Sequence, residues 1–136
     1  KVKVTTVGVH VRRSDFLDEK WSKRGLVPAP LAYFIHAMSY FRNLYSNVLF
    51  VIASDDLEWV KENLSGKDVV FTEGKTPEED FGILINCDHI IISSGSFGWW
   101  AAWLNKGTTI YYKGYLRGRK DFNLSTYYYP EWIQME

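Results

Sequence analysis

Val7-Gly8-Val9-His10-Val11-Arg12-Arg13-Ser14-Asp15 is the stretch of sequence that decides the fold. Its three valines alternate with Gly8 and His10, which is the period-two pattern of a strand with one packed face. The strand runs directly into two adjacent arginines. Charged groups at the end of a buried strand are costly to desolvate unless a ligand or a fixed partner compensates them. We therefore expect a buried strand that leads into a binding loop.

The paired arginines predict an anion site at the end of this strand. Ligands of open α/β sheets bind outside the carboxyl ends of the strands, and the planar guanidinium fork matches phosphate oxygens in pairs. Either arginine alone is explained equally well by an ion pair with Asp15, because exposed ion pairs are common and weak. Arg12 and Arg13 together, with His10 facing the same way, favour a bound anion, and we expect a diphosphate.

Strands and helices alternate along the rest of the chain. Further strands are predicted at 48–53, 67–72, 89–92 and 108–112, and helices at 31–44, at 57–64, from Thr76-Pro77 and at 99–104. The segments from Phe16 to Pro30 and from Lys113 onward are predicted to be loops. Four alternations with short links predict an α/β fold with a doubly wound, mostly parallel sheet.

Local signals mark where two of the helices begin. Thr76 is a capping residue, followed by a proline in the first turn and a capping-box glutamate. Ser54 or Asp55 is predicted to cap the helix at 57–64. At least one of the acidic pair Asp55 and Asp56 is expected to serve that helix end. Asp80 lies in the first turn after Thr76, where it complements the helix dipole or contacts a ligand.

A second anion cradle is predicted where the strand at 89–92 leads into the next helix. The connection reads Ser94-Gly95-Ser96-Phe97-Gly98. Glycines let the backbone approach a ligand, and the first N–H groups of a helix carry the positive end of its dipole. Alone, such a loop is more simply an ordinary tight turn and cap. Beside the arginines at the same sheet edge, it favours a diphosphate bridge, as in a nucleotide sugar.

The composition excludes several classes of function. The 136 residues suit one domain. Sixteen Lys and Arg balance sixteen Asp and Glu, so no global field attracts nucleic acid or an anionic membrane surface. The single cysteine, Cys87, excludes an internal disulfide and is predicted to be a core thiol. The histidines have no metal-ligand spacing, and there is no D-x-D motif that would hold a divalent ion.

Three stretches resemble one family. Residues 10–15 resemble the H-x-R-R-x-D motif of the alpha-1,2-fucosyltransferases, and more loosely that of alpha-1,6- and protein O-fucosyltransferases. Residues 80–104 are similar to that family's second motif block, and residues 129–132 match its C-terminal end. The resemblance covers nearly the whole chain. It implies the Rossmann-like half of a GT-B glycosyltransferase, with residues 1–136 as the GDP-fucose-binding domain of a longer chain.

The implied reaction is the transfer of fucose from GDP-fucose to the 2-hydroxyl of a terminal galactose, with inversion and without a metal or cofactor. The implied partners are GDP-fucose, a galactose-terminated glycan and an N-terminal acceptor-side domain missing from this chain. The implied location is the lumenal side of the Golgi membrane. A non-catalytic nucleotide-sugar or anion-binding module is the alternative, because no general base can be assigned from these residues.

The resemblance also implies roles for particular residues. Arg12 becomes the catalytic residue, at the β-phosphate of the leaving GDP, and Asp80 accepts hydrogen bonds from two N–H donors of guanine. The implied donor-binding set is His10, Arg12, Arg13, Asp15, Asp80, Ser94, Gly95, Ser96, Phe97 and Gly98. The family usually has glycine at the position of Ser14. Serine is expected to be strained there if that position requires a positive φ.

Overall fold

A computed structural model describes residues 3–14, 17, 19–22, 27–73, 76–115 and 123–136. In chain order its elements are β1 (Thr5–Val11), α1 (Glu19–Ser22), α2 (Leu31–Leu44), β2 (Val48–Ser54), α3 (Leu57–Asn63), β3 (Val69–Phe71), α4 (Pro77–Asn86), β4 (His89–Ile91), α5 (Ser96–Leu104), β5 (Thr109–Tyr112), α6 (Leu124–Tyr127) and β6 (Ile133–Met135). Strands and helices alternate, as the apolar pattern predicts.

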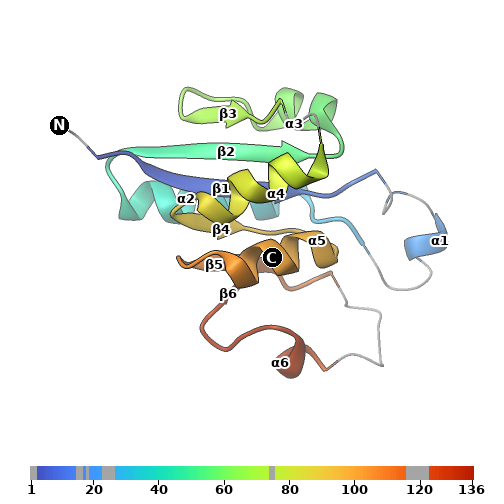
Figure 1. Ribbon diagram of the computed structural model, residues 1–136. Helices are drawn as coiled ribbons and strands as arrows, with labels where there is room; N and C mark the ends of the chain where they lie inside the picture. The colour runs from blue at the N-terminus through green and yellow to red at the C-terminus, as the bar shows by residue number, and fades with distance from the viewer. Residues whose placement is uncertain (1–2, 15–16, 18, 23–26, 74–75, 116–122) are drawn as a thin grey trace.

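The strands form one six-stranded sheet in the order β3-β2-β1-β4-β5-β6 (Figure 1). Every neighbouring pair is parallel. The chain moves outward from β1 to β3 on one side and from β4 to β6 on the other. The order of the strands therefore reverses between β1 and β4, and the crevice outside the carboxyl ends of the strands at such a switch point is where α/β proteins bind ligands. The prediction of an α/β fold is confirmed.

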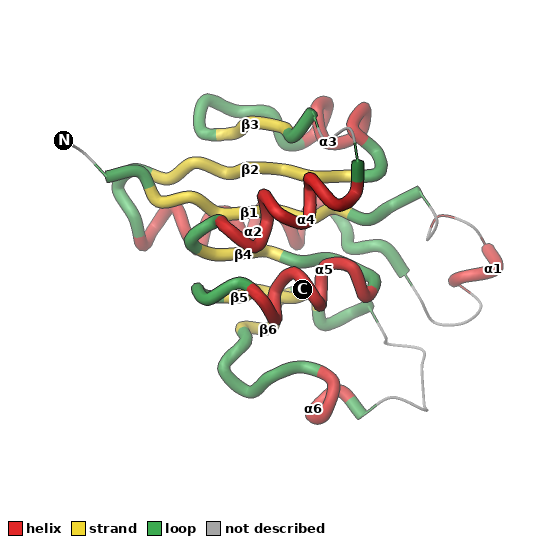
Figure 2. Tube along the Cα trace, viewed as in Figure 1, coloured by secondary structure: helices red, strands yellow, loops and turns green. Residues whose placement is uncertain are grey.

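Helices cover both faces of the sheet. In Figure 2, α4 and α5 cross in front of the strands and α2 runs behind them. The buried side chains divide in the same way, because one apolar cluster joins the sheet to α2 and α3 and a second joins it to α4 and α5. A sheet buried on both faces needs nearly continuous apolar strands. This is why strands such as β2 lack the alternating pattern of β1.

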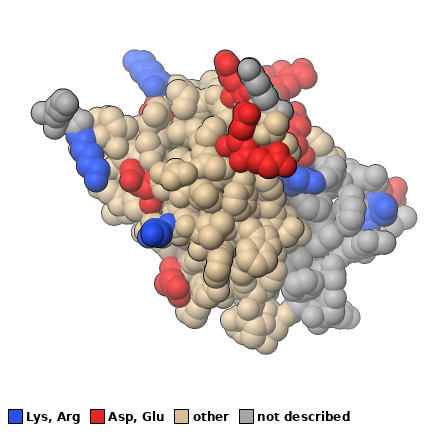
Figure 3. Space-filling view, in the orientation of Figure 1, with Lys and Arg blue, Asp and Glu red and all other residues tan. Residues whose placement is uncertain are grey.

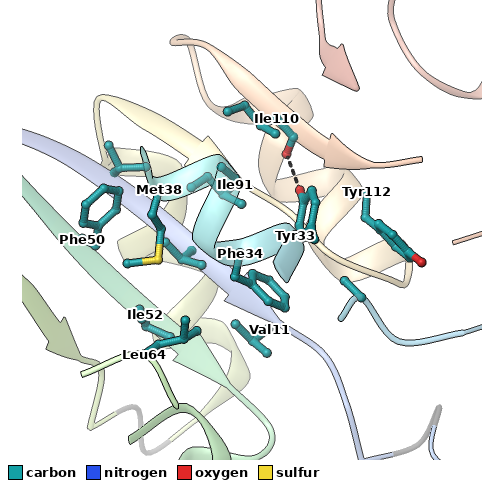
Figure 4. Close-up of a cluster of buried hydrophobic side chains, with 14 of the residues drawn as sticks. Val11, Tyr33, Phe34, Met38, Phe50, Ile52, Leu64, Ile91, Ile110 and Tyr112 are labelled. Carbon is teal, nitrogen blue, oxygen red and sulfur yellow. Dashed lines mark hydrogen bonds between the residues drawn. The ribbon is translucent and has the colours of Figure 1, made fainter. Parts of the chain in front are cut away.

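The two faces of β1 pack against different helices. Val7, Val9 and Val11 are fully buried in the cluster that α2 completes (Figure 4). Gly8 and His10 point to the opposite face. A Cβ atom on Gly8 would come within 2.9 Å of Leu84 Cδ2, so glycine allows α4 to pack directly on the strand. The alternation seen in the sequence therefore separates the core face of β1 from the face that carries the site.

The α2 face of the core also holds the central strands together through polar contacts. Five residues on one side of α2 are buried: Tyr33, Phe34, Ala37, Met38 and Phe41. The hydroxyl of Tyr33 donates to the carbonyl oxygen of Ile92, just after β4, and to that of Ile110 in β5. Figure 4 shows the bond to Ile110. A buried hydroxyl needs such partners. This contact fixes α2 against the strands at the same edge as the crevice.

Three expectations about the elements need correction. The connection after β4 turns into α5 at Ser96, and the expected start at Trp99 is three residues too late. Gly95 has φ 98°, a value that side-chain-bearing residues rarely adopt, so the glycine lets the chain turn at once into the helix. The segment from Phe16 to Pro30 is not all loop, because it contains α1. The segment from Lys113 onward is not all loop either, because it contains α6 and the edge strand β6. All three elements are too short to carry a periodic pattern.

Within the described residues, no helix combines the length and the apolar character needed to cross a membrane.

Candidate functional site

A cavity of about 200 Å³ opens at the carboxyl end of β1. Its walls come from the ends of β1 and β2 and the starts of α4 and α5, and they consist of His10, Arg12, Ser54, Asp55, Thr76, Pro77, Asp80 and Phe97. Complete sites for small molecules usually measure roughly 300–1,000 Å³. The cavity therefore suits one part of a nucleotide, such as its base or its diphosphate.

His10 forms the floor of this cavity in its neutral form. Its ring lies 4.8 Å from that of Phe97, centroid to centroid, and only 5% of the residue is exposed. Burial, and then the charge of Arg12, lower the pKa of His10 to about 3. Its Nδ1 atom is buried and has no hydrogen-bond partner within the described structure. The neutral ring of His10 therefore lines the cavity without adding charge to it.

Gly98 allows α5 to approach His10 this closely. A Cβ atom at residue 98 would lie 3.0 Å from His10 Nδ1 and 3.2 Å from Ile92 Cβ. Both distances are shorter than ordinary van der Waals contact, so any larger residue would push the helix or the histidine aside. The glycine of the second cradle thus acts through packing on the histidine of the first motif.

Asp80 supplies a second buried atom without a partner. It lies in the first turn of α4, where Thr76 caps the helix through a bond from Glu79 N to its Oγ1 at 3.1 Å. Asp80 Oδ1 is buried and accepts no hydrogen bond from the described residues. Buried polar atoms are nearly always paired in folded proteins. An unpaired carboxylate oxygen in a cavity wall is therefore best explained by a ligand with N–H or O–H donors.

Acidic side chains gather over the start of α4 (Figure 3). They include Glu78, Glu79 and Asp80, all in its first turn. This charge complements the positive end of the helix dipole. Dipole complementarity accounts for the carboxylates that remain in solvent, but it does not account for the buried, unpaired oxygen of Asp80.

The side chains of Arg12 and Arg13 lie in different places. Arg12 lines the cavity, and its backbone N–H donates to Ser93 Oγ at 2.9 Å. The Arg13 guanidinium instead lies over the ring of Trp59, with Cζ 3.9 Å from the ring centroid, and its Nε is 3.5 Å from Asp56 Oδ2. These contacts turn Arg13 toward α3. Of the pair that the sequence treats as one anion site, only Arg12 belongs to the cavity wall.

One member of the acidic pair after β2 serves the end of α3, as predicted, but the capping residue differs from the prediction. Asp56, and neither Ser54 nor Asp55, caps α3, because its Oδ1 accepts from Trp59 N at 3.2 Å. Asp55 faces the arginine loop, which we define as residues 12–14, and accepts hydrogen bonds from its backbone. Sequence reasoning missed this contact. The signal was available in the parallel pairing of β1 and β2, which brings the residues after both strands together.

The second cradle contributes unequally to the cavity. Phe97 is in its wall, and Ser96 is the exposed first residue of α5. Ser94 is fully buried, and its hydroxyl donates to Val27 O at 2.5 Å. Ser94 therefore ties the segment before α2 to the sheet. Asp15, the remaining member of the implied donor-binding set, lies outside the described residues.

The expected strain at Ser14 is absent. No described residue other than glycine has a positive φ, and Ser14 is among those described. Its N–H and hydroxyl groups both donate to Asp55. Serine therefore fits the loop without a left-handed backbone.

The other hollows that the described residues form around Thr108 and around Cys87 lack these features. One of about 450 Å³ lies beside Thr108 and Thr109, at the amino end of β5. Its Asn105 side chain already bonds the backbone of Leu84, Cys87 and Gly107. Ligands of parallel sheets bind at the opposite, carboxyl edge. Cys87 is only half-buried, and burial raises the pKa of its thiol, which makes it a poor nucleophile.

Comparison with known proteins identifies the relatives of this chain. Residues 2–136 match the family model for glycosyl transferase family 11. The chain is 38% identical to galactoside 2-alpha-L-fucosyltransferase SEC1 of Bos taurus over 138 residues. It is also 38% identical to galactoside alpha-(1,2)-fucosyltransferase 1 of Homo sapiens over 141 residues. Each alignment covers 95% of this chain and 38% of the relative, so the chain spans well under half the length of these proteins. A match over this much of the chain shows that it belongs to glycosyl transferase family 11.

Proposed function

We propose that this chain is the donor-binding part of an alpha-1,2-fucosyltransferase, and that the donor is GDP-fucose. The observation that carries the proposal is the cavity that Arg12 and the neutral His10 line together with Asp80, whose buried Oδ1 has no partner among the described residues. Its place at the switch point of the sheet supports a nucleotide ligand. The names of the relatives support the choice of fucose and of the 2-hydroxyl of a galactoside as the acceptor.

In the proposed reaction, the bond between fucose and the β-phosphate breaks as the galactose 2-hydroxyl attacks from the opposite face. Negative charge grows on the departing GDP while the sugar becomes positive. The guanidinium of Arg12 and the first N–H groups of α5 are suited to stabilise that charge, because fixed dipoles need no reorganisation during the reaction. We propose that these groups suffice without a divalent ion. The acceptor hydroxyl loses its proton as the new bond forms, and we assign no base for that proton within this chain.

Asp80 is proposed to select the base of the donor. Guanine offers adjacent N1–H and N2–H donors, and one carboxylate can accept from both. The buried Oδ1 atom of Asp80 supports this role. His10 is proposed to contact the guanosine through its neutral ring.

A transfer assay with the full protein tests the proposal. GDP-fucose is supplied with a galactose-terminated disaccharide, or with the matched 2-deoxygalactoside that lacks the acceptor hydroxyl. We expect GDP release and a fucosylated product, with inverted anomeric configuration, only with the first acceptor. Binding of GDP without turnover on any galactoside would instead assign the chain to a non-catalytic nucleotide-sugar module. Failure to bind GDP at all would reject both functions.

A further inference from the structure

Side chains that follow the two strands on either side of β1 hold three consecutive backbone N–H groups of the arginine loop. Arg12 N donates to Ser93 Oγ at 2.9 Å, from the β4 side. Arg13 N and Ser14 N donate to the two carboxylate oxygens of Asp55 at 2.9 and 3.1 Å, from the β2 side. Hydrogen bonds to a carboxylate are roughly twice as strong as neutral ones. Asp55 is therefore the stronger of the two attachments.

The same aspartate also contacts the side chains of the loop. Its Oδ2 lies 3.6 Å from Arg12 Nε, and its backbone carbonyl accepts from Ser14 Oγ at 3.2 Å. Asp55 itself belongs to the cavity wall. One residue thus binds the backbone on the C-terminal side of Arg12 and the base of its guanidinium group.

The register of the sheet places Asp55 beside the arginine loop. Val11 and Ser54 are partners in the parallel ladder of β1 and β2, and Ser54 Oγ donates to Val11 O at 2.7 Å. The two strands therefore end at the same level, and the next residue of β2 lies beside the arginine loop. Asp55 is free for this task because the adjacent Asp56 caps α3.

We propose that Asp55 is a positioning residue for the donor, which sets the direction in which Arg12 presents its guanidinium to the cavity. This inference rests on the proposed function, because it assigns Asp55 a role only through Arg12. The physical reason is that an arginine on an unsupported loop adopts many directions, and a displacement of about 1 Å in a binding group can cost on the order of 10²-fold in rate. A carboxylate that holds two successive N–H groups removes that freedom.

A double-mutant cycle in the full protein tests this role. The variants are Asp55→Ala, Arg12→Lys and the double substitution, each measured for GDP affinity and for kcat/KM with GDP-fucose. Asp68→Ala is the matched control, because its carboxylate also accepts two hydrogen bonds, from Arg42 at 2.7 and 3.0 Å, outside the candidate site. We expect Asp55→Ala alone to lower kcat/KM roughly tenfold or more. In a protein that already carries Arg12→Lys, adding Asp55→Ala should lower kcat/KM hardly any further.

Asp55→Asn extends the test. Its amide oxygen can still accept from one N–H group, so we expect it to recover part of the activity that Asp55→Ala loses. The asparagine variant replaces alanine in the cycle if the alanine variant does not fold. Additive losses in the cycle would overturn the inference, as would an Asp55→Ala protein with the kinetics and melting temperature of Asp68→Ala. If the unsubstituted protein neither binds GDP nor transfers fucose, the proposed function fails first, so the two failures are distinguishable.

Discussion

At the scale of single residues, Arg12 is the group on which the proposed chemistry depends most. It follows β1 directly, lines the cavity, and is bound through its backbone to Ser93. Lysine keeps the positive charge but replaces a planar fork by a point charge, so it cannot make two parallel contacts with a phosphate. Arg13 offers no substitute, because it packs on Trp59.

We therefore expect Arg12→Lys to lower turnover with GDP-fucose by on the order of 10²–10³-fold, the usual cost of losing one donor aimed at developing charge. Steady-state kinetics on the purified full protein measure this. Arg13→Lys is the comparison, and it should cost much less. Wild-type turnover in Arg12→Lys would refute the assignment of Arg12.

Asp80→Asn tests how the base is recognised. An amide cannot accept hydrogen bonds from both guanine donors with the strength of a carboxylate. Because a hydrogen bond to a charged group contributes about 1.5–3 kcal/mol, we expect GDP affinity to fall roughly tenfold or more. Calorimetric titration with GDP and with ADP should also show that discrimination between the two bases is reduced.

The competing explanation of Asp80 makes the opposite prediction. If the residue only complements the dipole of α4, its loss costs about 0.3–1 kcal/mol of stability and leaves GDP affinity unchanged. Thermal unfolding measured beside the titration separates the two explanations.

At the scale of elements, the apolar pattern of the sequence was sufficient to predict the strands whose residues are mostly buried. The alternating valines of β1 and the apolar residues of β2, β4 and β5 predicted strands that the sheet buries, and the Thr76 cap begins α4 as predicted. β6 could not be predicted in this way, because a strand of three residues is too short to show an alternation of apolar and polar residues. Only its pairing with β5 makes it a strand.

The candidate site was predictable in its parts but not in its contacts. His10, Arg12, Asp80 and Phe97 share one cavity, as their positions after strands and at helix starts suggest. The capping preference of a local sequence cannot distinguish Asp55 from Asp56, because the choice depends on the arginine loop 41 or 42 residues away in the chain. The divergence of Arg13 from Arg12 likewise depends on Trp59, which belongs to another element.

Gly98→Ala tests the contact between α5 and β1. Overpacking a tight core contact typically costs about 1–3 kcal/mol, and alanine recovers about 0.5–1 kcal/mol of helix propensity. We expect a net loss in the free energy of unfolding, together with weaker GDP binding, because the new methyl group displaces His10. Denaturant titration measures the first effect and calorimetry the second.

Gly82→Ala is the matched control for that experiment. Gly82 lies inside α4, and a Cβ atom there would have no neighbour within 4 Å. The same substitution should therefore raise the free energy of unfolding by about 0.5–1 kcal/mol. Equal responses at residues 98 and 82 would show that the contact with His10 is not tight.

At the scale of the whole molecule, the proposed charge arrangement predicts a reaction that needs no metal. Arg12 and the start of α5 would supply the positive charge that a divalent ion supplies in other transferases. We expect fucosyl transfer by the full protein to persist in excess EDTA. Loss of transfer that only Mn²⁺ or Mg²⁺ restores would contradict this part of the proposal.

The buried histidine makes the stability of the molecule depend on pH. The pKa of His10 is lowered to about 3 in the folded protein, against an ordinary value of 6.5, because burial and the charge of Arg12 oppose protonation. The unfolded chain therefore binds one more proton than the folded chain between these two values. The contribution of the neutral histidine to stability is complete above pH 6.5 and is lost as the pH falls toward 3.

We expect the free energy of unfolding to fall by about 1.4 kcal/mol per pH unit near pH 5 from this group alone. His89, whose pKa is also lowered by burial, adds a slope of the same sign. His10→Gln leaves His89 and the carboxylates in place, so the difference between the two proteins isolates His10. Denaturant titrations of both, between pH 4.5 and pH 7, should give a shallower slope for the variant. Parallel slopes would show that His10 becomes protonated in the folded state and is not held neutral beside Phe97 and Gly98.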